Sequence, residues 1–487
     1  MEPRPQSSRL TWLAVALGAG ACALLGSVGA DARWLAALGR TIVSQGSIPA
    51  GVPYAAAPSV DWANVPVLGE LVFHALQVVG GDRGLLLGQL VAVTVALTLL
   101  ALGMRALGAR DAARATVLLL AQLVAVSLTL TLLALGMRAL GAPDAASAAV
   151  LVLVFFAAFP SFIIVRAQLF SLVLFCVALL LLRAESRRPS RRVWLLVPLI
   201  VLWANLHGAV LVGLAVVASY LVLERARREP VVAASVLAAC CAALFLTPAL
   251  AASGKYYLGV LRSEAAQRGE GMWAPLSLHR PFDVLFIVLA LPLLVWAFRS
   301  GGLRVWELAC IAALAGLTLH AGRNSVWLLC FLAALAARGL GKRSLRDVSV
   351  SPRTLVLCAS IPAAFLVLGV VQTPRQHAAG ERVRSEAARL AAGKPILADG
   401  IDAEQLALDG RRVWIANPLD AFSRRDQRLY LDWLDASPAG DALLREATAV
   451  VVTRGSKPQQ RLERDRSFRR AALDGKAAVY VRVPSNE

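Results

Sequence analysis

Apolar stretches long enough, or nearly long enough, to cross a bilayer dominate this chain and restrict what it can fold into. They cover Leu10–Ala30, Gly84–Arg105, Thr116–Met137, Ala145–Ile163, Gln168–Leu182, Val193–Asn205, Ala209–Leu223, Val231–Ala249, Val284–Phe298, Val305–His320, Asn324–Ala337 and Thr354–Val371. Hydrophobic residues make up 58% of the chain, against about 45–50% in soluble domains. The predicted fold class is mostly α: a polytopic transmembrane helical bundle with about 11–13 hydrophobic segments over residues 1–371.

The formal charge of +19 is a topology signal rather than a nucleic-acid footprint. From Gln372 onward the chain has 20 Lys/Arg against 16 Asp/Glu, so most of the excess lies among the apolar segments. Short basic loops occur at Arg183–Arg192, at Arg225–Arg228 and after Arg338. Basic loops stay in the cytoplasm, so we expect no nucleic-acid partner and a tail on the opposite side of the membrane.

The tail, residues 372–487, has a different composition and is predicted to form a small extracytoplasmic α/β domain. Short apolar runs indicate strands at Pro395–Ala398, Val413–Ala416, Ala449–Val452 and Ala478–Val481. Charged amphipathic stretches indicate helices at Glu381–Ala391, Arg424–Leu434, Gly440–Glu446 and Pro458–Arg464. A segment of this size can bury a core of its own.

A tandem repeat complicates the count of crossings. Residues 89–113 recur at residues 122–146 with four differences, which indicates a recent duplication. If both copies crossed, Arg183–Arg192 would lie outside, against the basic-loop rule. Either one copy does not cross, or Val65–Gly80 crosses as well. The first is favoured, because Glu70 and His74 would be costly in lipid.

The first external loop, residues 31–82, is the most informative polar segment. Asp31 directly follows the first apolar segment, and Trp34, Asp61 and Trp62 lie further along. A carboxylate at the membrane surface can deprotonate a sugar hydroxyl, and aromatic rings stack on pyranose faces. The alternative is that Asp31 only caps a helix. The loop therefore provides a candidate base, Asp31, and candidate substrate-binding residues.

Polar residues also occur where membrane segments meet the same external surface. Asn205 and His207 lie in WANLHG between two half-length apolar stretches, so they must face a polar cavity or pair with each other. Arg166 and Arg323 are expected on that side, where guanidinium groups can hold phosphate. The alternatives are a structural turn for His207 and snorkelling to lipid headgroups for Arg323.

These residues together resemble the polytopic bacterial GT-C glycosyltransferases. The resemblance rests on Asp31 with Trp34, G-x-I-P at Gly46–Pro49, W-x-N at Trp62–Asn64, R-x-Q-L-F at Arg166–Phe170, WANLHG at Trp203–Gly208 and R-N at Arg323–Asn324. It implies a multi-pass protein of the bacterial inner (plasma) membrane. It also implies a polyprenyl-phosphate sugar as donor, an extracytoplasmic acceptor, and Asp31 as the base.

The chain departs from the family pattern at three places. Val52–Ala55 stands where similar chains tend to read D-P-F-S, Val65–Leu68 where they tend to read H-E-W-L, and Met272 precedes Trp273 where Glu is usual. A non-catalytic membrane scaffold is therefore one alternative. A transporter is the other, although transporters show inverted repeats rather than this tandem one.

Motifs for cofactors are absent from the sequence. There is no P-loop, dinucleotide fingerprint or zinc spacing, and all seven cysteines fall in apolar segments. We predict no cofactor, and leave open a divalent ion bound by carboxylates at Asp31. The expected partners are a lipid-linked sugar donor and membrane lipids.

Overall fold

The computed structural model describes residues 27–59, 61–82, 144–341 and 380–483, with isolated positions 17, 25 and 85. Its described residues divide into two compact units. Unit 1 contains residues 144–246 and 271–341, and unit 2 contains residues 28–82, 247–270 and 380–483. Nearly all of the tandem repeat and of Gly84–Arg105 lies outside the described residues, as does nearly all of Leu10–Ala30. The segments Thr116–Met137 and Thr354–Val371 lie wholly outside them.

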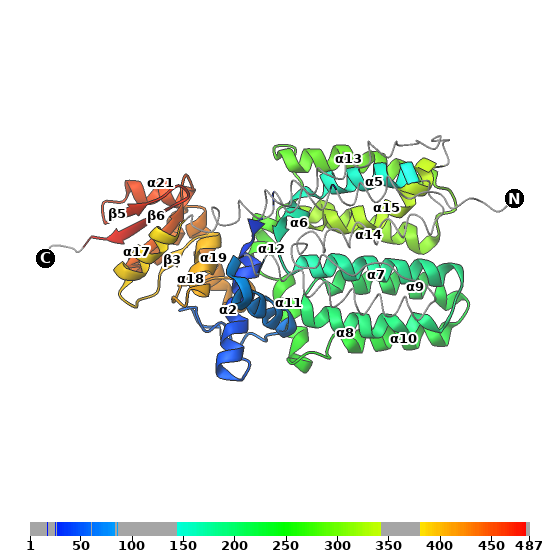
Figure 1. Ribbon diagram of the computed structural model, residues 1–487, viewed down its shortest axis with the longest axis horizontal. Coiled ribbons are helices and arrows are strands. Elements are labelled where there is room, and N and C mark those ends of the chain that lie inside the picture. The colour runs from blue at the N-terminus through cyan, green and yellow to red at the C-terminus, as the bar shows by residue number, and fades with distance from the viewer. Residues whose placement is uncertain are drawn as a thin grey trace. The chain divides into compact units, whose positions relative to one another are not determined.

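Unit 1 is helical, because its segments are apolar on all sides and long enough for several turns. Its α-helices are α5 (Asp144–Ala157), α6 (Phe159–Ile163), α7 (Gln168–Arg187), α8 (Leu196–Leu206), α9 (Val210–Leu223), α10 (Pro230–Ala243), α13 (Pro281–Arg299), α14 (Val305–His320) and α15 (Ser325–Gly341). Short elements join them: β2 (Ile164–Val165) and the 3₁₀ turns η1 (Arg191–Leu195), η2 (Arg225–Arg227), η4 (Gly271–Trp273) and η5 (Gly322–Asn324). Figure 1 shows α7–α10 as one group and α5, α13, α14 and α15 as another.

Among the described residues of unit 1, two helical stretches are long and apolar enough to cross a membrane. They are Pro281–Arg299 and Gly322–Gly341, the second comprising η5 and α15. Apolar helices at Ala146–Ala157, Pro230–Ala243 and Val305–His320 are shorter. The sequence predicted about 11–13 hydrophobic segments, and the boundaries of its predicted Val305–His320 are those of α14.

The basic connections of unit 1 gather at one end. Arg225 pairs with Glu185 at 3.3 Å, Arg304 pairs with Glu224, and Arg338 donates to Ser300 Oγ at 3.2 Å. These contacts join the ends of α7, α9, α13 and α15 to the start of α14. The predicted basic loops therefore share one end of unit 1, as the positive-inside rule requires of a membrane bundle.

Unit 2 brings together three stretches of chain. From the first external loop come α2 (Ala30–Gln45) and a helix over residues 67–82, and β1 (Ser27–Val28) precedes α2 in the chain. Residues 247–270 supply η3 (Leu250–Ala252), α11 (Ser253–Leu261) and α12 (Glu264–Arg268). The tail supplies α17 (Glu381–Ala391), β3 (Leu397–Ala398), α18 (Gly400–Leu408), η6 (Leu419–Ala421), α19 (Arg424–Leu434), η7 (Pro438–Gly440), α20 (Asp441–Glu446), β4 (Ala449–Thr453), α21 (Lys457–Arg464), β5 (Phe468–Leu473) and β6 (Ala477–Arg482).

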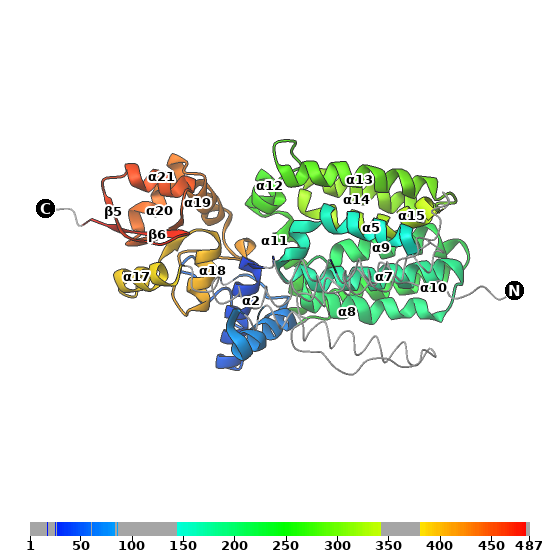
Figure 2. The same ribbon diagram turned by 45° about the horizontal axis from the view of Figure 1, so that its top comes forward.

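The tail forms a sheet with the order β3-β4-β6-β5, in which only β3 and β4 are parallel. Figure 2 shows α17 on one side of this sheet and α20 and α21 on the other. Because both faces are covered, the central strand β4 is a continuous apolar run whose first four residues are buried. The predicted α/β character of the tail is confirmed, with β5 as a strand that the sequence did not predict.

The first external loop extends the edge of this sheet. Ala56 N donates to Val413 O at 2.8 Å, and Val413 N donates to Tyr54 O at 3.0 Å. Val413 in turn bridges to Ile396, next to β3. The predicted strand Val413–Ala416 thus exists as an isolated bridge between the loop and the sheet. This pairing covers the β3 edge of the sheet.

The stretch from residue 247 to residue 270 is fastened to the tail as well. Arg268 pairs with Asp432 at 2.8 Å, and Gln427 Oε1 accepts from Glu264 N at 2.9 Å. Residues 247–270 therefore share one compact unit with the first external loop and the tail.

Candidate functional site

Asp31 lies in the first turn of α2. The helix begins after Gly29, which is extended, and ends at Gly46, whose left-handed conformation (φ 66°) favours glycine. A carboxylate in the first turn of a helix is stabilised by the unpaired amide groups and the helix dipole. Asp31 is partly exposed, whereas Trp34, one turn later, is buried.

Two arginines fix α2 against α18. Arg33 Nε donates to Gln405 Oε1 at 2.6 Å, and Arg33 Nη2 donates to Asp82 at 2.9 Å. One turn further on, Arg40 donates to the carbonyl oxygens of Ala407 and Leu408 at the end of α18. The carbonyls at a helix C-terminus have no partner within the helix, so guanidinium groups satisfy them well. Asp31 is therefore held in a fixed place relative to the tail.

Glu404 is a buried acid of α18 next to this contact. Its side chain is 1% exposed, and Oε1 accepts from both the backbone N and the side-chain Nδ2 of Asn417, at 2.7 and 2.8 Å. Tyr54 Oη donates to Asn417 O at 2.9 Å. Burial raises the pKa of Glu404 well above its usual range; the Asn417 bonds oppose the rise and the charge of Asp31 adds to it.

Glu70 is a second buried acid, on the helix over residues 67–82. It is 0% exposed, and Asn64 Nδ2 donates to its Oε2 at 2.7 Å. Burial raises its pKa to about 8, against the lowering effect of the Asn64 hydrogen bond. Gly39 of α2 lies directly on this helix: a Cβ there would be 2.2 Å from Glu70 O. The first external loop thus has a tightly packed interior that contains an acid.

Trp62 belongs to the core of unit 2 and touches the tail. It is buried, and its Nε1 donates to Asp420 Oδ2 at 3.2 Å. Tyr256 meets its ring edge-on, with centroids 6.4 Å apart. Burial raises the pKa of Asp420 to about 6, although the Trp62 hydrogen bond lowers it. Asp61, beside Trp62, is exposed.

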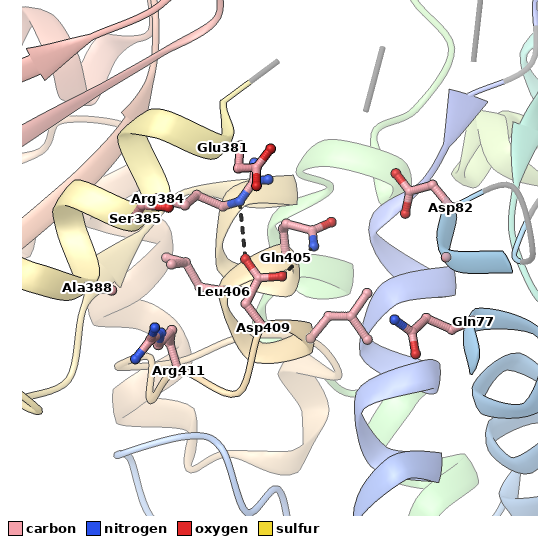
Figure 3. A pocket seen from close by; sticks show the side chains of 12 residues that line it. Gln77, Asp82, Glu381, Arg384, Ser385, Ala388, Gln405, Leu406, Asp409 and Arg411 are labelled. Atoms are coloured by element: carbon pink, nitrogen blue, oxygen red, sulfur yellow. Dashed lines mark hydrogen bonds and ion pairs between the residues drawn. The ribbon is translucent and has the colours of Figure 1, made fainter. Parts of the chain in front are cut away.

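A polar pocket of about 340 Å³ lies in unit 2 between α17, α18 and residues 77–82. Figure 3 shows Arg384 of α17 reaching Asp409, at 3.4 Å, while Gln405 of α18 donates to the other oxygen of Asp409 at 2.8 Å. Asp82, Glu381 and Arg411 also line the pocket. The mixed charges suit a polar ligand, but Arg384, Gln405 and Asp409 already pair with one another.

His207 is the C-cap of α8 in unit 1 and shares a hydroxyl with Trp203. Ser171 Oγ lies 2.8 Å from His207 Nδ1 and accepts from Trp203 Nε1 at 2.7 Å. Asn205 instead donates to Val201 O and Leu246 O, at 2.9 and 2.8 Å. The turn thus connects Asn205 to its own helix and to the segment after α10, and connects His207 to α7.

Arg323 lies in η5, and its guanidinium group stacks over the Trp273 ring at 4.7 Å. The turn is fixed by Gly322 N, which donates to Ala274 O at 2.9 Å. Arg166 is partly exposed just before α7.

Helices α9 and α14 pack against each other. The Arg304–Glu224 pair joins the end of α9 to the start of α14, so the two helices are antiparallel.

The antiparallel packing determines which of these residues share an end of unit 1. His207 precedes α9 and Arg323 follows α14, so both lie at the end opposite the basic loops. The Ser171–His207 contact brings the start of α7, and with it Arg166, to the same end. The phosphate-binding candidates of unit 1 therefore face one side.

Three polar side chains that contact or lie near the candidate site residues were not predicted from the sequence: Glu404, Asp420 and Ser171. Glu404 reads as one acid among several in an ordinary helix, and Asp420 as part of a loop. The serine lies inside an apolar helix and pairs with WANLHG only in three dimensions. Within the described ranges, no three His, Cys, Asp or Glu side chains are arranged to hold a metal ion.

Unit 1 is a helical bundle with its basic connections at one end, and unit 2 combines the first external loop with a C-terminal α/β domain. The predicted resemblance to the GT-C glycosyltransferases is confirmed at the level of fold. The chain is similar to the crystal structure of ArnT from Cupriavidus metallidurans bound to undecaprenyl phosphate. The TM-score is 0.52 and the identity 13%, over 97% of this chain and 98% of that one. No family model and no curated relative matches the sequence.

Proposed function

We propose that this protein is a multi-pass glycosyltransferase of the bacterial inner membrane, which transfers a sugar from a polyprenyl-phosphate donor to an extracytoplasmic acceptor. The tail, residues 372–487, is extracytoplasmic in this proposal. The supporting observation is that Asp31, the first external loop and the tail form one compact unit, fixed by the Arg33 and Arg40 contacts with α18. That unit keeps Asp31 partly exposed and well positioned for use as a base.

The donor phosphate has its own candidate residues in unit 1. Arg323, stacked on Trp273, presents a planar guanidinium group, and His207 is oriented by Ser171. Arg166 lies at the same end. These groups suit a phosphate monoester or diester, because guanidinium groups grip two oxygens at once. The undecaprenyl phosphate in the similar ArnT structure supports a lipid phosphate as the donor's carrier.

Replacement of Asp31 tests the proposal directly. The purified protein, in vesicles with a polyprenyl-phosphate sugar and a membrane extract as acceptor source, should release polyprenyl phosphate. Asp31→Asn should reduce this release by about 10²–10⁴-fold, the usual contribution of a general base, and Asp31→Glu should retain a trace. Glu446→Gln is the control, because Glu446 is an exposed acid of the same unit that belongs to no candidate site. Full turnover by Asp31→Asn would remove Asp31 from the mechanism.

The scaffold alternative makes a different prediction for the same experiment. A non-catalytic protein would release no polyprenyl phosphate with any sugar donor, and the Asp31→Asn variant would equal the wild type. Its motivation is that Val52 and Pro66 are apolar where similar chains carry polar or acidic residues. A transporter would instead move a sugar lipid without cleaving it.

A further inference from the structure

The hydroxyl group of Ser171 connects two side chains of the WANLHG turn in unit 1. Trp203 Nε1 donates to Ser171 Oγ at 2.7 Å, and Ser171 Oγ lies 2.8 Å from His207 Nδ1. Trp203 and Ser171 are both 0% exposed, whereas His207, at the end of α8, is partly exposed. A buried chain of polar groups therefore ends on an imidazole ring that is not itself enclosed.

The hydrogens in this chain can be placed from the groups that only donate. An indole N–H and a backbone amide have no lone pair to offer, so each can act only as a donor. Ala209 N donates to His207 Nδ1 at 3.3 Å, which requires a lone pair on that nitrogen. Ser171 must then supply the hydrogen of its contact with Nδ1, while its oxygen accepts from Trp203. The hydrogen bonds run in one direction, from Trp203 through Ser171 to His207.

This direction determines the tautomer of His207. A neutral imidazole ring carries one hydrogen, and the nitrogen that carries it is set by the hydrogen bonds of the other nitrogen. Nδ1 accepts from the Ala209 amide and the Ser171 hydroxyl, so the hydrogen belongs to Nε2. A second hydrogen on Nδ1 would point at the hydrogen of the amide, which disfavours the charged ring as well. The assignment holds whatever group Nε2 contacts.

Packing keeps the indole group in the orientation that the chain requires. The Trp203 ring meets Phe175 of α7 edge-on, with centroids 6.4 Å apart. Gly213 of α9 also lies against the indole, because a Cβ there would be 2.3 Å from its Cζ3. Hydrogen bonds in such a dry interior strengthen one another. Two neighbouring helices therefore hold the first donor of the chain in place.

We propose that Trp203 and Ser171 are positioning residues, which hold His207 as the Nε2–H tautomer so that it donates a hydrogen bond to the phosphate of the sugar donor. The oxygens of an ionised phosphate only accept hydrogen bonds, so a lone pair on Nε2 would repel them. An Nε2 that carries a hydrogen also cannot take up a proton, so His207 is not a general base and that role stays with Asp31. The inference deepens the proposed function and rests on it.

Kinetic variants separate positioning from packing. Ser171→Ala removes the hydroxyl partner of Nδ1 and should lower kcat/KM for a polyprenyl-phosphate sugar by about 2–10-fold, the range for one hydrogen bond. Ser171→Thr keeps the hydroxyl and should retain most of the activity. His207→Gln has an amide N–H and no tautomers, so Ser171→Ala should cause no further loss in that background. An equal loss in both backgrounds would mean that Ser171 only packs, and would overturn the proposal.

A second serine of the bundle provides the matched control. Ser219 lies in α9, and its hydroxyl donates to Ala215 O of the same helix at 2.8 Å. Ser219→Ala removes one hydroxyl from an apolar helix of unit 1 without touching the chain that ends on His207. It should equal the wild type in kinetics and in the tautomer of His207.

Nitrogen NMR of protein labelled in its histidine rings, in lipid bilayers, gives a readout that packing alone does not move. The His207 signals are those lost in His207→Gln, and they should show a bare Nδ1 and a protonated Nε2. Ser171→Ala should add a population with hydrogen on Nδ1. A hydrogen on Nδ1 in the wild type, or an unchanged tautomer in Ser171→Ala, would overturn the proposal and leave the proposed function intact. If the tautomer is as expected but the wild type cleaves no sugar donor, the proposed function fails and the chain has no role in catalysis.

Discussion

Replacing Glu70 by glutamine should change how stability depends on pH. Glu70 is completely buried in unit 2, with Asn64 as its hydrogen-bond donor and a pKa raised from 4.5 to about 8. Glutamine preserves the shape and an acceptor oxygen for Asn64 but has no proton to lose. The variant therefore isolates the effect of ionising one buried acid.

The magnitude follows from the two pKa values. Between about pH 4.5 and about pH 8 the unfolded chain releases the Glu70 proton while the folded protein keeps it, so this group favours folding less as pH rises. Each pH unit in that window corresponds to about 1.4 kcal/mol. The whole window gives about 5 kcal/mol, and the range from about pH 5 to about pH 7.5 gives about 3 kcal/mol.

The measurement is equilibrium unfolding in mixed micelles across that pH range. Other carboxylates also titrate there, so the informative quantity is the free energy of unfolding of Glu70→Gln minus that of the wild type. This difference should rise by about 3 kcal/mol from about pH 5 to about pH 7.5. Glu446→Gln, at an exposed position of α20, controls for the removal of one carboxyl group. Parallel curves for Glu70→Gln and wild type would show that Glu70 is not protonated in the folded protein.

Three further outcomes follow from the proposed topology and site. Arg323→Lys should lower sugar transfer, because an ammonium group keeps the charge but cannot bind two phosphate oxygens with a planar group. If the variant and the wild type transfer sugar at equal rates, Arg323 serves only to stack on the Trp273 ring. Reporter fusions at Ser344 and Gly455 should report opposite compartments, and a cytoplasmic signal from both would refute the external tail. Deleting Gln89–Ala121, one repeat length, should leave the tail on the same side, whereas a relocated tail would show that both copies cross.

Local patterns were sufficient to predict several elements of the tail. Glu381–Ala391 and Arg424–Leu434 were predicted with the observed boundaries of α17 and α19, because charged and apolar positions alternate there with a helical period. β5 was missed because its sequence, FRRAAL, has exposed arginines typical of a loop. Its strand conformation comes from pairing with β6, a tertiary effect that propensity does not contain.

The site required contacts that no sequence window spans. Asp31 was a candidate from its place after the first apolar segment, but Glu404 becomes its neighbour only when α2 packs on α18. The pairing of Ala55 with Val413 likewise joins distant parts of the chain. Side-chain contacts inside apolar helices cannot be predicted from a local pattern either: no sequence motif indicates that Ser171 contacts His207.

The apolar residues of the first external loop bear on whether the protein is an enzyme or a scaffold. Val52 and Val65 stand where similar chains tend to be polar, and they are 3% and 0% exposed, so packing inside unit 2 accounts for their apolar character. Glu70 and Glu404 are just as buried yet remain acids. Replacing a buried ion pair by well-packed apolar residues is often neutral or stabilising, so packing alone does not require either carboxyl group. Both carboxyl groups lie near Tyr54, and Glu404 also lies near Asp31, which agrees with the catalytic function proposed for this unit.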